Sequence, residues 1–319
     1  MRRWLPGLIA LTLAWPAAAL AQGWKPPRTP DGRPDLQGIW TNATITPLER
    51  PAAMKDKAVL TEEEVAAIEK RTAEARAAND KPGPLETGSY NRFWYDDGTT
   101  ILSTRQTSLV VDPPDGRVPV KASAEARRDD YNARSADSYE FMSPWDRCIT
   151  RGVPGSMFPA GYNNAYQIIQ TPGYVTIHYE MIHDARIIPI DSKAPISKRS
   201  QTWFGESRGH WDGDTLVVGT TNYHNRGWIT TSQASGRIKG IPHSDKLHVV
   251  ERFTRTSKDE ITYSATIEDP EIYERPWTIR FPLTLDPEYR IFEYACHEGN
   301  YAIENILRGA RALDKAQKQ

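Results

Sequence analysis

The chain has 319 residues, and its 40 basic and 41 acidic side chains give a formal net charge of −1. This balance excludes a global electrostatic attraction to nucleic acid or to an anionic membrane, so partner choice must come from a local site. The length suffices for one large β domain, or for two smaller domains, with a sizeable buried core.

The first residues have the pattern of a cleavable secretory signal peptide. Two arginines form a basic start, an apolar stretch follows, and small residues end the segment at Ala21. We therefore expect residues 1–21 to be removed on export, which leaves a periplasmic or secreted chain. No later stretch approaches the roughly 20 uninterrupted apolar residues of a membrane helix, so we predict no membrane insertion.

Cys148 and Cys296 are the two cysteines of the chain. An oxidising compartment favours a disulfide between them, and the alternative is two separately buried thiols. A disulfide would bring Arg151 and the loop at residues 162–164 near His297.

Residues 22–106 are predicted to form an extended arm and a surface helix. Frequent prolines up to about Pro51 block regular helix and central strands. In the segment 60–80, Thr61 can cap a helix while Glu64 reaches back to it. The apolar stripe of this helix is thin, which is typical of a helix on the surface.

Residues 107–319 are predicted to form a β domain that ends in a helix. Strand-like segments alternate with turn signals at Pro113 to Gly116, Pro172-Gly173, Asp212-Gly213, Ser257 to Asp259 and Asp286-Pro287. Consecutive hairpins predict a mainly β, antiparallel meander. Such a meander hides its edges by closing into a lipocalin-like barrel or a two-sheet sandwich.

Two segments of this domain differ from the strand pattern. Residues 121–141 are polar and are predicted to be a loop. Near the end of the chain, Ile303, Ile306, Leu307 and Ala310 occur at helical spacing. This spacing predicts an amphipathic helix packed across the outside of the barrel or over one end.

Several segments together resemble a large family of exported bacterial proteins, most of which have no assigned activity. They are "PDLQGIW", "HDARIIPID", "GHWDGDTLVV", "LHVVERFTR", "IEDPEIYERPWT" and "EYACHEGNY". The resemblance covers nearly the whole mature chain and implies no particular mechanism. In addition, Gly38-Ile39-Trp40 is similar to the Gly-x-Trp of the first strand in lipocalin-like barrels, which implies a barrel with a pocket.

The stretch "YEMIHDARIIPID", residues 179–191, contains the candidate catalytic residues His183, Asp184, Glu180 and Arg186. If the strand runs straight through, Glu180, Asp184 and Arg186 share one face. If the chain turns at Asp184-Ala185, His183 and Arg186 become cross-strand neighbours. We predict His183 as the general acid/base, Asp184 or Glu180 as its partner, and Arg186 as the group that steadies negative charge. The alternative is a solvated hairpin end with an ion pair of little consequence.

Further polar and aromatic residues are candidates for substrate binding: Tyr162, Asn163, Asn164, Trp211, Tyr223, His224, Trp228 and His297. Aromatic faces with a few hydrogen-bonding groups suit a flat or ring-shaped ligand. Ordinary packing at the end of a barrel explains these residues equally well.

Cofactor and nucleic-acid sites have little support in the sequence. The seven histidines show no metal-binding spacing, so we predict no metal, although distant strands could assemble one from His183, His224 and His297. The chain lacks a nucleophile elbow, a phosphate-binding loop and a dinucleotide fingerprint, so no cofactor is predicted. No basic stripe indicates nucleic-acid binding.

The sequence therefore predicts an exported enzyme with a small-molecule substrate. It would use acid/base chemistry, as a lyase, isomerase or hydrolase does, on an organic molecule with an aromatic or other ring held in a barrel pocket. The alternatives are a non-catalytic periplasmic carrier for a small hydrophobic ligand and a carbohydrate-binding module. The oligomeric state does not follow from these patterns.

Overall fold

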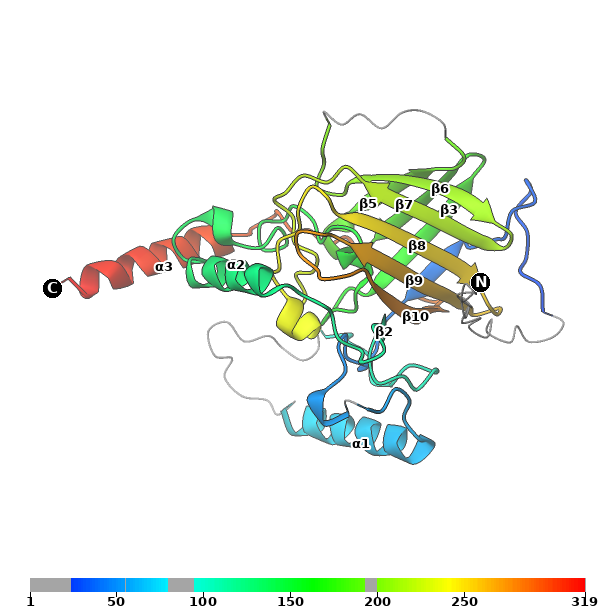
Figure 1. Cartoon of the computed structure of the whole chain (residues 1–319), viewed down its shortest axis with the longest axis horizontal. Coiled ribbons are helices and arrows are strands. Elements are labelled where there is room, and N and C mark those ends of the chain that lie inside the picture. Colours follow the sequence, from blue (N-terminus) through cyan, green and yellow to red (C-terminus); the bar gives the residue numbers. More distant parts are fainter. Residues whose placement is uncertain (1–23, 55, 80–94, 193–199, 319) are drawn as a thin grey trace, which may run out of the picture.

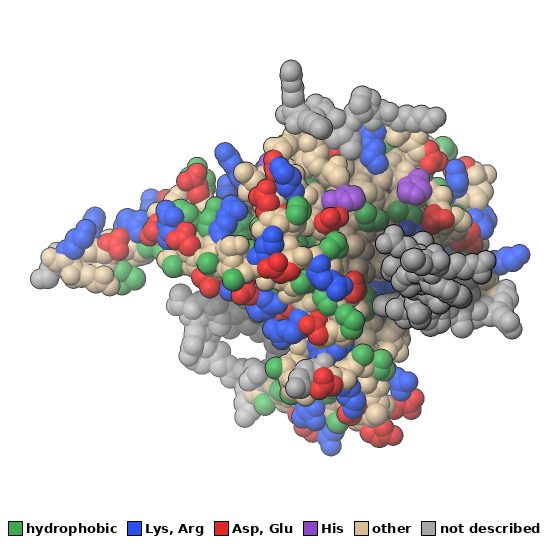
Figure 2. Space-filling model, viewed as in Figure 1, with side chains coloured by type: hydrophobic (Ala, Val, Ile, Leu, Met, Phe, Trp, Pro, Cys, Tyr) green, Lys and Arg blue, Asp and Glu red, His purple; other side chains and the backbone are tan. Residues whose placement is uncertain are grey.

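A computed structural model describes residues 24–54, 56–79, 95–192 and 200–318 (Figure 1). The predicted signal peptide, residues 1–21, lies outside the described residues. None of the helices in the described part of the chain is both long and apolar enough to cross a membrane. Acidic and basic side chains are interspersed over the face shown in Figure 2, in keeping with the balanced net charge.

The predicted antiparallel β-barrel is confirmed. In the described ranges, ten strands form one sheet, and nine of them follow one another in the order β5-β4-β3-β1-β10-β9-β8-β7-β6. The strands are β1 (Gly38–Thr41), β2 (Val110–Asp112), β3 (Ala165–Thr171), β4 (Tyr174–Tyr179), β5 (Ala185–Pro189), β6 (Glu206–Asp212), β7 (Thr215–Thr221), β8 (His248–Arg255), β9 (Glu260–Glu268) and β10 (Trp277–Leu285). The sheet curls into a nearly closed barrel and not into a two-sheet sandwich (Figure 1).

The barrel closes where β5 meets β6, and this junction differs from all the others. Every other pair of neighbours along the path is antiparallel. A ring of nine strands cannot alternate in direction all the way round, so one pair must run parallel. Between β5 and β6, the described residues form a single parallel bridge, Ile190 with Gly209, and the amide of Asp191 donates to the Gly209 carbonyl over 2.8 Å. We call this junction the seam.

Large side chains point inward from the strands and fill the barrel. The bulkiest fully buried residues include Trp40, Tyr179, Tyr223, Phe253, Tyr263, Trp277 and Phe281. Because successive residues of a strand point to opposite faces, the buried positions alternate, as they do along β9. Burial of this apolar surface is the main stabilising contribution to the fold.

Three predicted hairpin turns are confirmed, and two hairpins are not formed. Pro172-Gly173 joins β3 to β4, Asp212-Gly213 lies between β6 and β7, and Ser257 to Asp259 lies between β8 and β9. Asp286-Pro287 ends β10, but no strand returns after it in the described chain. The reason is that β10 already pairs with β9 on one edge and with β1 and β2 on the other. Similarly, β2 pairs with β10, and no strand follows the turn at Pro113 to Gly116.

The predicted N-terminal arm contributes to the barrel itself. Its residues 38–41 form β1, which lies between β3 and β10 and joins the last strand of the meander to the first. Before β1, Arg28 forms an ion pair with Asp214 at 2.7 Å, which holds the arm against the β6–β7 turn. The arm therefore contributes a strand to the sheet and also contacts the β6–β7 turn from outside.

The helices are α1 (Glu62–Asn79), α2 (Ala122–Ala133) and α3 (Ala302–Ala316), and five short 3-10 turns are η1 (Ala52–Met54), η3 (Tyr139–Phe141), η4 (Gly155–Met157), η5 (Met181–His183) and η6 (Gln233–Ile238). The capping box of α1 is confirmed: the Thr61 amide donates to Glu64 over 2.8 Å, and the Glu64 amide donates to the Thr61 hydroxyl over 3.3 Å.

Two helical segments depart from expectation. The predicted loop at residues 121–141 contains α2, whose Ala124 is buried and whose alanines, glutamate and arginines are good helix formers. The C-terminal helix α3 does form, but it buries no residue and runs away from the barrel (Figure 1). The prediction that it packs across the barrel or closes one end is therefore wrong.

The predicted disulfide between Cys148 and Cys296 is confirmed, with a Cα–Cα distance of 5.6 Å. It joins the irregular tail after β10 to the loop that precedes β3. This loop lies at the barrel end where β3 begins and β4 ends, which we call the capped end.

Candidate functional site

The predicted catalytic stretch forms the turn between β4 and β5. β4 ends at Tyr179, a single 3-10 turn occupies Met181–His183, and β5 begins at Ala185. The reversal therefore lies at residues 180–184 and not at Asp184-Ala185. Ile182 and His183 have φ values of 61° and 46°, in the left-handed region that L residues adopt only when the surroundings hold them there.

The turn does not bring His183 and Arg186 together. His183 is exposed, and its Nδ1 lies 2.7 Å from the carbonyl oxygen of Tyr294. Arg186 is paired across the strands with Ile177 and is 3% exposed. The predicted cooperation of His183 with Arg186 therefore lacks the required proximity, and an acid/base role for His183 stays a prediction.

Arg186 points into the barrel and forms an ion pair with Glu251, which is fully buried on β8. Its Nη2 lies 2.5 Å from Glu251 Oε2 and donates also to the Thr220 hydroxyl over 2.8 Å. Its Nε donates to the Ser207 hydroxyl over 2.8 Å. The Tyr263 hydroxyl donates to the second Glu251 oxygen over 2.9 Å. Each charge thus has an opposite charge and further hydrogen bonds, as a buried pair requires.

Two further hydroxyls face this ion pair without a hydrogen bond of good geometry. They belong to Tyr179 and Tyr223, both essentially inaccessible to solvent, and Nη1 of Arg186 likewise has no hydrogen bond of good geometry to any described residue. Burial raises the pKa of Tyr179 to about 12 and that of Tyr223 well above its ordinary value. Both phenols therefore stay protonated and are available as neutral hydrogen-bond donors in the core.

A pocket of about 240 Å³ opens at the seam. It is lined by Ala185, Arg186, Ile187, Pro189, Phe204, Gly205, Glu206 and Ser207. Arg186 and Ser207 are buried, whereas Ile187 is exposed, so the pocket runs from the outside of the barrel toward the ion pair. The seam allows this opening because β5 and β6 are not joined there by a regular ladder of hydrogen bonds.

Asp184 directly precedes the pocket residues Ala185 and Arg186 in the chain. It is half-buried, and its Oδ2 accepts a hydrogen bond of 2.9 Å from the Thr150 hydroxyl. Burial raises the pKa of Asp184 to about 6, although the hydrogen bond from Thr150 and the charge of His183 act in the opposite direction. A carboxyl group with this pKa exchanges protons readily near neutral pH.

Glu180 is fully buried and belongs to a separate polar cluster at the capped end. The Tyr289 hydroxyl donates to it over 2.9 Å, and Asn163 Nδ2 donates to Glu180 Oε1 over 3.0 Å. Burial raises its pKa, against these hydrogen bonds. Asn164, also a predicted binding residue, is buried and donates to Asp96 over 3.0 Å. These contacts hold the turn and the tail together.

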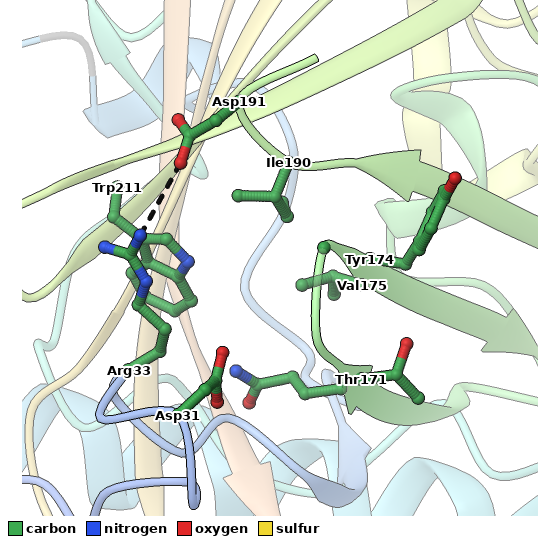
Figure 3. A pocket seen from close by; sticks show the side chains of 10 residues that line it. Asp31, Arg33, Thr171, Tyr174, Val175, Ile190, Asp191 and Trp211 are labelled. Atoms are coloured by element: carbon green, nitrogen blue, oxygen red, sulfur yellow. Dashed lines mark ion pairs between the residues drawn. The ribbon is translucent and has the colours of Figure 1, made fainter.

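Trp211 lies at the opposite end of the barrel from Glu180. It lines a small pocket of about 90 Å³ with residues of the β3–β4 turn and of the arm. Arg33 of the arm forms an ion pair with Asp191 at 3.5 Å beside Trp211 (Figure 3). Trp211 is thus separated by the length of the barrel from the predicted binding residues at the capped end.

The remaining predicted binding residues are spread over the capped end. Tyr162 lies against Tyr95, Trp145 and Tyr294. The ring of His224 contacts that of Trp203 at a centroid distance of 4.0 Å, Trp228 is buried, and His297 beside the disulfide is exposed. Within the described ranges, no three histidine, cysteine or acidic side chains gather as a metal-binding group.

Prediction from the sequence missed the partners of Arg186. Glu251 carried the clearest signal, because it alternates with Val249 and Phe253 on the apolar face of β8. A carboxylate on a buried face requires a positive partner. Ser207 and Thr220 carried no such signal, since small hydroxyl residues are common on strands.

Comparisons with known proteins identify no relative: no protein-family model, no curated protein and no solved structure matches this chain.

Proposed function

We propose that the protein is an exported enzyme that moves protons on a small organic molecule bound at the seam, with Asp184 as its acid/base group. The observation that carries the proposal is the half-buried Asp184 carboxyl, whose pKa is about 6, directly before the pocket residues Ala185 and Arg186. A group that titrates near the working pH can both accept and donate a proton during turnover.

The walls of the seam pocket suit an organic ring. Ile187, Pro189 and Phe204 supply apolar contacts, and Ser207 supplies a hydroxyl. Arg186 is already neutralised by Glu251, so it would donate hydrogen bonds to a substrate oxygen without requiring a net charge on the substrate. Such a donor stabilises negative charge that develops on the oxygen during proton abstraction.

The other predicted catalytic residues take supporting roles in this proposal. The charge of His183 lowers the pKa of Asp184, so this exposed histidine tunes the acid/base group from outside. Glu180 positions the turn through Asn163 and Tyr289. Export agrees with the disulfide between Cys148 and Cys296, which persists in oxidising compartments.

A panel of ring-containing small molecules, with products detected by mass spectrometry, tests the proposal. The wild type should convert at least one compound. Asp184→Asn should lose at least about 100-fold in kcat and keep its affinity, because general acid/base groups contribute roughly 10²–10⁴-fold. Ala185→Trp should lose binding, since the indole occupies the pocket.

Ile169→Trp is the matched control for the second variant. Ile169 is an outward, 40% exposed residue of β3 that does not line the seam pocket, so this variant should keep full activity. Unchanged kcat in Asp184→Asn would contradict the assignment of the acid/base group. Unchanged affinity in Ala185→Trp would place the substrate elsewhere.

A carrier without chemistry is the second candidate function. The observation that favours it is the mostly apolar wall of the seam pocket, which fits a small hydrophobic ligand. Binding that Ala185→Trp abolishes, with no product from any bound compound, would support the carrier. The carbohydrate-binding alternative has less support, because none of the described tryptophans is exposed.

A further inference from the structure

Arg151 is a buried guanidinium in a loop at the capped end of the barrel. Residues 150–160, which precede β3, are buried without interruption. Loops normally lie on the surface, where their polar groups meet water. Here Asn42 Nδ2 donates to the Met157 carbonyl over 2.7 Å, and the Ser232 hydroxyl donates to the Pro159 carbonyl over 3.2 Å. Arg151 itself is 3% exposed.

Among the residues that the structure describes, Arg151 has no partner of opposite charge. Its Nη2 donates to the Phe158 carbonyl oxygen over 3.2 Å, and in the described chain this is its single hydrogen bond and no carboxylate forms an ion pair with it. Arg186 and Arg237, by contrast, both pair with carboxylates. Burial lowers the pKa of Arg151, which reflects the cost of a charge removed from water. A buried charge is normally compensated by an opposite charge, and the described residues supply none to Arg151.

Three phenols act electrostatically on this charge. Tyr166, Tyr162 and Tyr294 all lie close enough to interact with the guanidinium electrostatically. Burial raises the pKa of Tyr166 well above its ordinary value, so this phenol remains neutral and cannot compensate the charge. A neutral phenol can instead donate a hydrogen bond to an anion that the guanidinium attracts.

Half-buried aromatic rings pack beside the end of the buried loop, at Ala160. Trp145, Tyr162 and Tyr294 pack on a small apolar cluster that comprises Ala160, Met181 and Ile182. The rings of Tyr162 and Tyr294 are nearly parallel, at 9°, with centroids 6.4 Å apart, and Trp145 lies 5.9 Å from Tyr162. Contiguous aromatic surface beside a buried charge is typical of a site that binds a ligand with a ring and a charged end.

We propose that Arg151 and these aromatic side chains form a binding site for a small organic acid. The carboxylate of the ligand pairs with the guanidinium, and its ring lies against Trp145, Tyr162 or Tyr294. A monoanion fits the site because a single guanidinium is present and the buried phenol of Tyr166 is neutral. A planar carboxylate also matches the two parallel donors of a guanidinium. This site does not depend on the seam pocket or on the proposed function.

Calorimetric titration of the full, oxidised chain with benzoate tests the proposal. Benzamide, which has the same ring without the charge, and acetate, which has the charge without the ring, are the matched ligands. Benzoate should bind at least about tenfold more tightly than benzamide, since a hydrogen bond to a charged group contributes roughly that factor or more. It should also bind more tightly than acetate, because its ring adds apolar contact. Arg151→Met should weaken benzoate binding by about 10- to 100-fold, while Arg151→Lys should weaken it less.

Arg226→Gln is the control, because it removes an exposed positive charge elsewhere and should leave benzoate binding unchanged. The proposal is overturned if benzoate does not bind, or if it binds Arg151→Met as well as the wild type. Equal binding of acetate would also overturn it, since the rings would then contribute nothing. A benzoate affinity lost in Ala185→Trp but kept in Arg151→Met would assign the ligand to the seam pocket and likewise overturn this site.

Discussion

Arg186 in the barrel interior and Arg151 at the capped end are buried to the same extent, and their surroundings differ. Arg186 is 3% exposed and contacts a carboxylate and two hydroxyls. Arg151 is equally buried, but a single carbonyl oxygen accepts a hydrogen bond from it in the described chain. The phenol of Tyr166 cannot neutralise its charge, because burial raises the pKa of this group.

Arg186 has a partner of opposite charge within the protein, whereas the partner proposed for Arg151 is a bound ligand. Inside the barrel, side chains from different strands point toward a common interior, so Arg186 and Glu251 can form an ion pair within the chain. The capped end is built from loops, which have no such regular spacing. A buried charge there is retained at a cost to folding, which is the pattern expected of a binding group.

The largest expected effect is that of Arg186→Met on stability. This change leaves the Glu251 carboxylate buried without its partner, and breaking a buried ion pair costs about 3–5 kcal/mol. Urea unfolding of the purified variant measures the loss. The double variant Arg186→Met with Glu251→Gln should recover most of it, because no unpaired charge remains. A loss below about 1 kcal/mol would mean that water already reaches the pair.

Removal of the disulfide should have the next largest effect. Replacing Cys148 and Cys296 by serine should lower the free energy of unfolding by about 2–4 kcal/mol, since the bond spans 148 residues of sequence. Hydrogen exchange should rise in the tail after β10 and in residues 150–160, but not in β8 or β9. Uniform loss of protection across the barrel would contradict the separation of the two regions.

A smaller and pH-dependent effect is expected for Asp184→Asn. The carboxyl has a pKa of about 6 in the folded chain and an ordinary value of 3.8. At a pH between these two pKa values, the carboxyl is ionised in the unfolded chain and still protonated in the folded chain. The wild type therefore loses stability as pH rises from about 4 to about 6. The variant should lack this slope and gain about 1–3 kcal/mol relative to the wild type at pH 7.

Thermal or urea unfolding at pH 4 and at pH 7 measures this difference, and the two curves for the variant serve as its own control. A constant difference between the variant and the wild type at both pH values would contradict the raised pKa of Asp184.

The smallest expected effect is that of Arg151→Met on stability without ligand. The change removes an unpaired buried charge and one hydrogen bond, so the free energy of unfolding should change by less than about 1 kcal/mol or increase. The same urea titration measures both arginine variants. A loss as large as that of Arg186→Met would show that Arg151 is structural.

Local patterns in the sequence determined the elements of this protein. Alternation of apolar residues and two-residue turns predicted the strands, Thr61 and Glu64 predicted the start of α1, and the exported context predicted the disulfide. The strands and the helix start depend on neighbours in the chain, whereas the disulfide followed from the presence of only two cysteines in an exported protein. The exception is α2, where a polar composition indicated a loop although its alanines favour a helix.

Only the tertiary structure decided how these elements meet. The parallel seam follows from the number of strands in the ring, and that number became nine because β1, from the arm, inserts between β3 and β10. The length of the turn at residues 180–184 decides which residues of β5 point into the barrel. As a result, Arg186 points inward and His183 lies outside. The contacts of Arg186 with Glu251 and the isolation of Arg151 depend on residues far apart in sequence, because burial and charge pairing are properties of the packed molecule.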